Sequence, residues 1–192
     1  MMRAVAFDAA PEARGVLHPS RLAEAFAALF VLLAAGANAA ELREPTGPAG
    51  PAFTLSAVGG GSLGPGDFAG RPLVIHFFAT WCAPCVEELG ALDRMAAAGR
   101  IAVLAIDVGE VEARVARFLE AHPVGFPVVL DPDRKVTRGW GVVALPSSFV
   151  LDGEQRIVGF VEGDLGWDAP AVAARLDELI GNREEKADDQ PT

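Results

Sequence analysis

Cysteine is scarce in this sequence, with only two in a chain of 192 residues. Small secreted folds that depend on disulfide staples carry about four or more cysteines, so the chain is not a disulfide scaffold. Only two residues separate Cys82 from Cys85. A bridge across so short a loop removes little entropy from the unfolded chain. The pair therefore predicts chemistry rather than structural stapling.

Basic residues and histidines are also few. The 16 Lys and Arg against 26 Asp and Glu give a net charge of −10. Nucleic-acid partners need a basic surface, so this charge excludes them, and it argues against docking on anionic lipid. A structural zinc site needs four Cys or His ligands, commonly with a second cysteine pair, whereas beyond the expected signal segment the chain has only Cys82, Cys85, His76 and His122 and no second pair. We expect no metal and no other cofactor.

Apolar runs are too short for a clear membrane span. Residues 25–35, AFAALFVLLAA, are uncharged, but a transmembrane helix needs about 20 apolar residues. The run follows a weakly basic lead and precedes the small-residue pattern Ala37-Asn38-Ala39, which is the layout of a secretory signal peptide. We expect residues 1–39 to be a signal peptide or an N-terminal anchor. The protein would then be periplasmic or otherwise extracytoplasmic, where thiols tend to oxidise.

The rest of the chain predicts one α/β domain at residues 53–181. A linker rich in Pro and Gly is expected at 40–52, and the charged residues 182–192 predict a disordered tail. Within the domain, apolar runs that predict strands alternate with helical patterns. We expect strands at 53–55, 73–78, 101–106, 126–130, 148–151 and 157–161, and helices at 84–98, 111–121, 135–140 and 169–180. This order predicts a sheet covered by helices, with a parallel first βαβ unit and a final hairpin.

The cysteine pair falls between a predicted strand and a predicted helix. Pro84 is well placed to open the helix, so Cys82 should lie at the helix N-terminus. Unpaired N–H groups and the helix dipole favour a thiolate there, and thiols in such places have a pKa below the usual value of about 8.5. The thiolate is the nucleophile of thiol–disulfide exchange. Cys82 is therefore the predicted attacking residue, and Cys85, one turn further on, the resolving residue.

Two further residues could handle the proton of Cys85. Glu88 lies on the next helical turn. If it faces inward, burial would raise its pKa and let it accept a proton; alternatively, it is solvated beside Glu87 on an exposed face. His76 lies on the strand that leads to the motif. It could lie beneath Cys85 and tune it, or it could be a satisfied core residue.

Several stretches together carry a resemblance to a known family. They are Phe53-Thr54-Leu55, PLVIHFFATWCAPCVEEL, FPVVLDPD, GVVALPSSFVLD and EQRIVGFVEG. Over about residues 51–181 the chain resembles the thioredoxin superfamily, and within it the TlpA/ResA-like exported thiol–disulfide oxidoreductases. The resemblance implies a thioredoxin-like fold, with a central mixed β-sheet flanked by helices and an N-terminal β extension.

The resemblance also implies roles for particular residues. Pro146 would be cis and face the cysteine pair, and the backbone of Leu145 would pair with the substrate chain. Glu88 matches an acidic residue of the family. The implied substrate-binding residues are Trp81, Ala83, Pro84 and Leu145. The chain departs from the usual pattern at three positions: His76 stands where thioredoxins have a buried Asp, Gly90 where Pro is frequent, and Arg134 where a Gly usually follows the turn.

Three functions follow from these residues. The first, implied by the resemblance, is a monomeric reductase of exported protein disulfides, such as those of apocytochrome c, with a membrane thiol-reductant donor of the DsbD or CcdA type. The second is a thioredoxin-fold thiol peroxidase. Its cysteine, however, belongs to a Pro-x-x-x-Thr-x-x-Cys pattern, and no proline lies close upstream of Cys82. The third is a copper chaperone, which usually has a wider cysteine spacing and a distal histidine. Here His122 is the only histidine after the motif.

Overall fold

The computed structural model describes residues 40–44 and 50–188, and the side chains as far as residue 181. The expected signal peptide or anchor at 1–39, part of the linker and residues 189–192 lie outside this range. Within the described part, no helix has the length and apolar character needed to cross a membrane.

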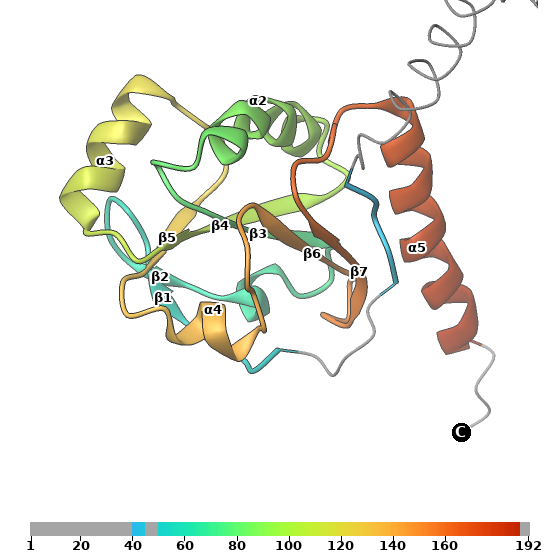
Figure 1. Cartoon of the computed structure of the whole chain (residues 1–192). Helices are drawn as coiled ribbons and strands as arrows, with labels where there is room; N and C mark the ends of the chain where they lie inside the picture. Colours follow the sequence, from blue (N-terminus) through green and yellow to red (C-terminus); the bar gives the residue numbers. More distant parts are fainter. Residues whose placement is uncertain (1–39, 45–49, 189–192) are drawn as a thin grey trace, which may run out of the picture. The chain divides into compact units, whose positions relative to one another are not determined.

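Five strands form one mixed sheet in the order β5-β4-β3-β6-β7 (Figure 1). Strands β3, β4 and β5 run parallel, and β6 and β7 pair antiparallel to complete the sheet. The parallel βαβ unit and the terminal hairpin are confirmed. The central position of β3 explains why all six of its residues are buried. The bounds are β3 Leu73–Phe78, β4 Ala102–Val108, β5 Val128–Asp131, β6 Ser147–Leu151 and β7 Ile157–Glu162.

Helices cover both faces of this sheet (Figure 1). Helices α2 and α3 lie over one face, where Val74 and Phe78 of β3 join the core, and helix α5 also packs there. The short helix α4 covers the other face, where Trp140 packs with Ile75 and Phe77. Since side chains alternate along a strand, His76 faces α2. The bounds are α2 Ala83–Ala97, α3 Glu112–Ala121, α4 Lys135–Gly139 and α5 Pro170–Asp188.

An N-terminal hairpin lies beside β5 on the α4 side of the sheet (Figure 1). Its strands are β1, Leu55–Ser56, and β2, Ser62–Leu63, and a 3-10 turn follows at Pro65–Phe68. The sequence predicted a first strand at 53–55 and no partner for it. Three consecutive glycines at 59–61, all with positive φ, make the reversal that brings the second strand back.

The end of the domain differs from expectation. Residues from Asn182 were predicted to be disordered, but helix α5 continues to Asp188. The physical reason is local. The added stretch is rich in Arg, Glu, Lys and Ala, which have high helix propensity, and Pro does not occur until residue 191.

Candidate active site

Cys82 and Cys85 lie where the central strand β3 gives way to helix α2. The backbone N–H of Cys82 donates to the carbonyl of Ala79 at 3.1 Å, which closes the turn. Cys82 is the N-cap residue of α2, and Pro84 falls in the first turn, where its missing N–H costs no hydrogen bond. The two cysteines form a disulfide with a Cα–Cα distance of 5.3 Å. The helix was predicted at 84–98 and is observed one residue earlier, at Ala83–Ala97; the expected place of Cys82 at its N-terminus is confirmed.

The two cysteines differ in their access to solvent. Cys85 is fully buried, whereas Cys82 is 7% exposed and lines a groove of about 500 Å³ beside α4. An incoming thiolate must reach a sulfur atom directly, so Cys82 is the one open to a partner. The first N–H groups of α2 have no intrahelical acceptor and favour negative charge at the same place.

Two of the four substrate-binding residues implied by the resemblance line this groove. Trp81 and Leu145 line it together with Cys82, and Trp81 is 62% exposed. Ala83 and Pro84 are exposed at the start of α2, next to Cys82, but neither lines the groove. The structure thus brings Trp81 and Leu145 together at the reactive sulfur and leaves the other two beside it.

The Leu145–Pro146 peptide bond is cis, in agreement with the resemblance. Pro146 is buried, and its carbonyl accepts a hydrogen bond from the N–H of Gly163 at 2.9 Å. The loop before β6 is thereby tied to the end of β7. Leu145 of this loop lies in the groove, so the loop forms one wall of the site.

Glu88 faces inward, and its side chain is buried. Its Oε2 accepts hydrogen bonds from the N–H of Leu165 at 2.9 Å and from Nε1 of Trp167 at 3.1 Å. Burial raises the pKa of Glu88 to about 7; the two hydrogen bonds oppose this rise, and the charge of Asp164 adds to it. A carboxyl group with a pKa near neutrality can take up and release protons under physiological conditions.

His76 lies next to Glu88 as a neutral ring. Its Nδ1 is 2.9 Å from Oγ of Ser148 and 3.5 Å from Oε1 of Glu88. Burial lowers the pKa of His76 to about 3, so the contact with Glu88 is not an ion pair. Within the described residues, neither Nε2 of His76 nor Oε1 of Glu88 has a hydrogen-bond partner. The predicted role of His76 in tuning Cys85 stays a prediction. The polar contacts of its Nδ1 are with Ser148 and Glu88.

Sequence reasoning missed an acidic pair, Asp107 and Glu110, beside the site. Glu110 accepts hydrogen bonds from the N–H of Thr80 at 2.6 Å and from its hydroxyl at 2.8 Å. Asp107 accepts from the N–H of Glu110 at 3.3 Å, and both acids are buried. The pair thus holds the turn that carries Cys82. The sequence gives one sign of this pair, which is the presence of Asp107 inside the otherwise apolar strand AVLAIDV.

Burial raises the pKa of Asp107 to about 8, and the side chain and charge of Glu110 add to this rise, whereas the hydrogen bond from the backbone N–H of Glu110 opposes it. Burial also disfavours the charged form of Glu110, but its hydrogen bonds with Thr80 outweigh this and lower its pKa. At neutral pH Asp107 is therefore protonated and Glu110 is ionised. The two carboxyl groups carry one negative charge between them, as closely placed acids commonly do.

This arrangement predicts how Asp107→Asn changes stability. The protonated Asp107 favours the folded state fully below about pH 4, and that contribution is lost as the pH rises toward about 8. The variant should escape this loss, so its stability relative to the wild type should rise by up to about 5 kcal/mol between pH 4 and pH 8. Urea unfolding at several pH values measures it. Asp152→Asn is the control: it breaks a 2.8 Å ion pair with Arg156 and should destabilise at pH 8. If the free energy of unfolding changed with pH in the same way for the wild type and Asp107→Asn, Asp107 would not be the buried protonated acid.

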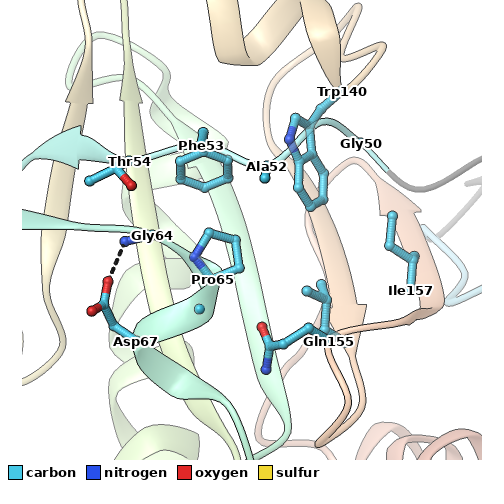
Figure 2. Close-up of a pocket in the computed structure, with 12 residues that line it drawn as sticks. Gly50, Ala52, Phe53, Thr54, Gly64, Pro65, Asp67, Trp140, Gln155 and Ile157 are labelled. Atoms are coloured by element: carbon cyan, nitrogen blue, oxygen red, sulfur yellow. Dashed lines mark hydrogen bonds between the residues drawn. The ribbon is translucent and has the colours of Figure 1, made fainter.

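A second hollow has a volume of about 540 Å³ and is lined by residues just before and after the N-terminal hairpin, together with Trp140, Leu151 and Ile157. Figure 2 shows that Phe53 and Trp140 border this hollow. The carboxylate of Asp67 accepts a hydrogen bond from the backbone N–H of Gly64 at 2.8 Å. Among the described residues that line it, Asp67 is the only ionisable one. This hollow lacks a reactive group, so the chemistry lies at the cysteines.

No group of three or more His, Cys, Asp or Glu side chains in the described part of the chain is arranged to hold a metal ion. What the site contains is a disulfide at the start of a helix, one accessible sulfur and a buried acid with a pKa near 7. Together with the thioredoxin-like fold, these features define a thiol–disulfide oxidoreductase. The family model described as AhpC/TSA matches residues 46–160, and the chain belongs to that family.

Known proteins agree with this class. The thiol-disulfide oxidoreductase ResA of Bacillus subtilis is 31% identical over 118 residues, which span 60% of this chain and 66% of the relative. The match thus covers just under two thirds of that relative's length. The exposed lipoprotein thioredoxin Etrx1 of Streptococcus pneumoniae has 25% identity and a TM-score of 0.58, covering 67% of this chain and 99% of that structure. StoA of Bacillus subtilis shares the fold, with 23% identity, a TM-score of 0.55, and coverage of 70% and 98%.

Proposed function

We propose that this protein is exported and that it reduces disulfides of other exported proteins through Cys82 and Cys85. The observation that carries the proposal is the asymmetry of the pair: Cys82 opens to a groove, whereas Cys85 is enclosed. One sulfur can form a mixed disulfide with a large partner, while the other is placed to resolve it internally.

The reaction begins with the reduced pair. The Cys82 thiolate attacks one sulfur of the substrate disulfide, which forms a Cys82–substrate bond and releases the other substrate sulfur as a thiolate. Cys85 then loses its proton and attacks Cys82, which forms the Cys82–Cys85 disulfide and releases the second substrate thiolate. The protein loses two electrons and the substrate gains them, and the two substrate thiolates take up protons.

In this scheme Glu88 accepts the proton of Cys85. Its position one helical turn after Cys85 and its pKa of about 7 support the assignment. The hydrogen bonds from Leu165 and Trp167 hold the carboxyl group in place. The Asp107–Glu110 pair positions the turn before Cys82 through Thr80.

The proposed function also specifies a compartment, an electron donor and a substrate. The signal-like layout at 1–39 supports export, and so does the similarity to Etrx1, which is an exposed lipoprotein. A reductase in an oxidising compartment needs a supply of electrons, and we propose a membrane thiol-reductant donor of the DsbD or CcdA type. Apocytochrome c is a candidate substrate, and the protein is proposed to act as a monomer.

The reduction potential of the Cys82–Cys85 pair tests the direction of electron flow. Equilibration of the full chain with glutathione buffers, read by thiol alkylation, should give a value well below about −220 mV, which fits a reductant. A value near about −120 mV would instead mean an oxidant that donates its disulfide. Peroxide consumption faster than that of a free thiol would favour the thiol peroxidase.

A further inference from the structure

The groove beside Cys82 carries positive charge in a protein whose net charge is −10. Arg134 and Arg138 line it, together with Cys82 and Leu145. Among its described lining residues, these two arginines are the only charged ones. Both are exposed, so their charge is available to a molecule that occupies the groove.

The backbone fixes the position of this charge. Arg134 has a positive φ of 56°, at the position where related turns usually have Gly. Its guanidinium lies over Gly109, at a place that a Cβ on Gly109 would occupy. The nearby acids are engaged elsewhere: Asp133 pairs with Lys135 at 2.6 Å, and buried Asp131 accepts from Thr137 at 2.6 Å. The ionised Glu110, next to Gly109, contacts Thr80 and Arg114 instead. None of these three acids neutralises the groove by a direct ion pair with Arg134 or Arg138.

The opposite side of the cysteine pair is acidic. Glu162 and Asp164 are exposed there. Glu162 is paired with Ser147 in the sheet register, next to Pro146, and Asp164 is close enough to Glu88 to raise its pKa. A polypeptide that crosses Cys82 therefore meets positive charge on the α4 side and negative charge on the β7 side.

Apolar side chains in the groove are unusually exposed. Val143 is 86% exposed and Trp81 62%, and Val142 is half-buried beside them. Covering such surface is favourable by about 25 cal/mol per Å² of apolar area. A single small disulfide compound would leave most of this surface open, whereas a segment of polypeptide could cover it.

We propose that the α4 groove receives the substrate segment on one side of its reactive cysteine and selects segments with an acidic side chain there. The proposal rests on the proposed function of the same site. Arg138 and Arg134 pair with the Asp or Glu of the segment, as arginine does with carboxylates, and apolar neighbours of that residue pack on Val142 and Val143. A basic residue at the same position would be repelled by α4 and so be disfavoured.

The test uses peptides that contain one disulfide and differ only by Glu or Lys near the reactive cysteine, with the change made on each flank in turn. Rates of reduction by the reduced full-length protein are measured at low salt. On one flank, the Glu peptide should react about tenfold faster than the Lys peptide. Arg138→Glu and Arg134→Glu should each shrink or reverse that ratio. Arg117→Glu makes the same charge change on α3, on the other face of the sheet, and should leave the ratio unchanged.

A second readout needs no variant. Added salt should slow the Glu peptide and speed the Lys peptide on the selective flank, because screening weakens both attraction and repulsion. Equal rates for Glu and Lys on both flanks would overturn the proposal. So would a ratio that Arg138→Glu and Arg117→Glu change alike. If the wild type reduces none of the peptides and no small aromatic disulfide either, the proposed function itself fails.

Discussion

Replacing Cys82 by serine is expected to abolish disulfide exchange, while replacing Cys85 by serine should trap a covalent adduct with the substrate. Cys82 is the sulfur that lines the groove, and a hydroxyl in its place is not a nucleophile for disulfides. Without Cys82, the fully buried Cys85 has no path to a protein partner. Without Cys85, the mixed disulfide on Cys82 forms but cannot be resolved from within.

Non-reducing gels and mass spectrometry of the Cys85→Ser protein, expressed in a cell that exports it, would measure the adducts. The double variant Cys82→Ser/Cys85→Ser is the matched control, and it should carry none. If adducts accumulate on Cys82→Ser instead, the attacking and resolving roles are reversed. The absence of adducts from both single variants would remove the mixed disulfide from the mechanism.

Glu88→Gln should produce the second large effect, a loss of about 100-fold in the rate of the resolving step above pH 7. In the wild type this rate should rise with pH through about 7, as Glu88 becomes the ionised acceptor. Glutamine cannot accept the proton, so the variant should lack this rise. Its amide oxygen can still accept from Leu165 and Trp167, so the fold should persist.

Glu87→Gln is the control, because Glu87 is the exposed neighbour on the same helix; its pH profile should match that of the wild type. Stability provides a second check. The protonated Glu88 favours the fold below about pH 4.5, and this contribution is lost as the pH rises through about 7. The Glu88→Gln variant should therefore be no less stable than the wild type at pH 8. A slow variant with an unchanged pH profile would mean that Glu88 has a structural role only.

The parts of the fold that depend on local pattern could be predicted from the sequence. The apolar run of β3, the proline after Cys82 and the periodic face of α2 were enough to locate the redox motif at a helix start. The cis Leu145–Pro146 bond was anticipated from the resemblance, because nothing in the spacing alone specifies it.

The polar network around the site could not be predicted in the same way. Its hydrogen bonds join residues far apart in the chain: His76 and Ser148 are 72 positions apart, and Glu88 and Trp167 are 79 apart. Such contacts depend on strand register and on the path of the loop after β7. The role of Asp107 likewise depends on Glu110 and Thr80 meeting at the end of β4, which periodicity does not reveal.

The contact between Trp167 and Glu88 gives the protein an internal optical reporter. The Trp167 indole is 1% exposed, and its N–H donates to the carboxyl group that titrates near neutrality. Indole emission depends on nearby charge, so the ionisation of Glu88 can be followed without an added label. Trp81, on the open surface beside Cys82, would report the arrival of a partner in the same spectrum. Proton uptake and docking could then be timed against each other in a single experiment.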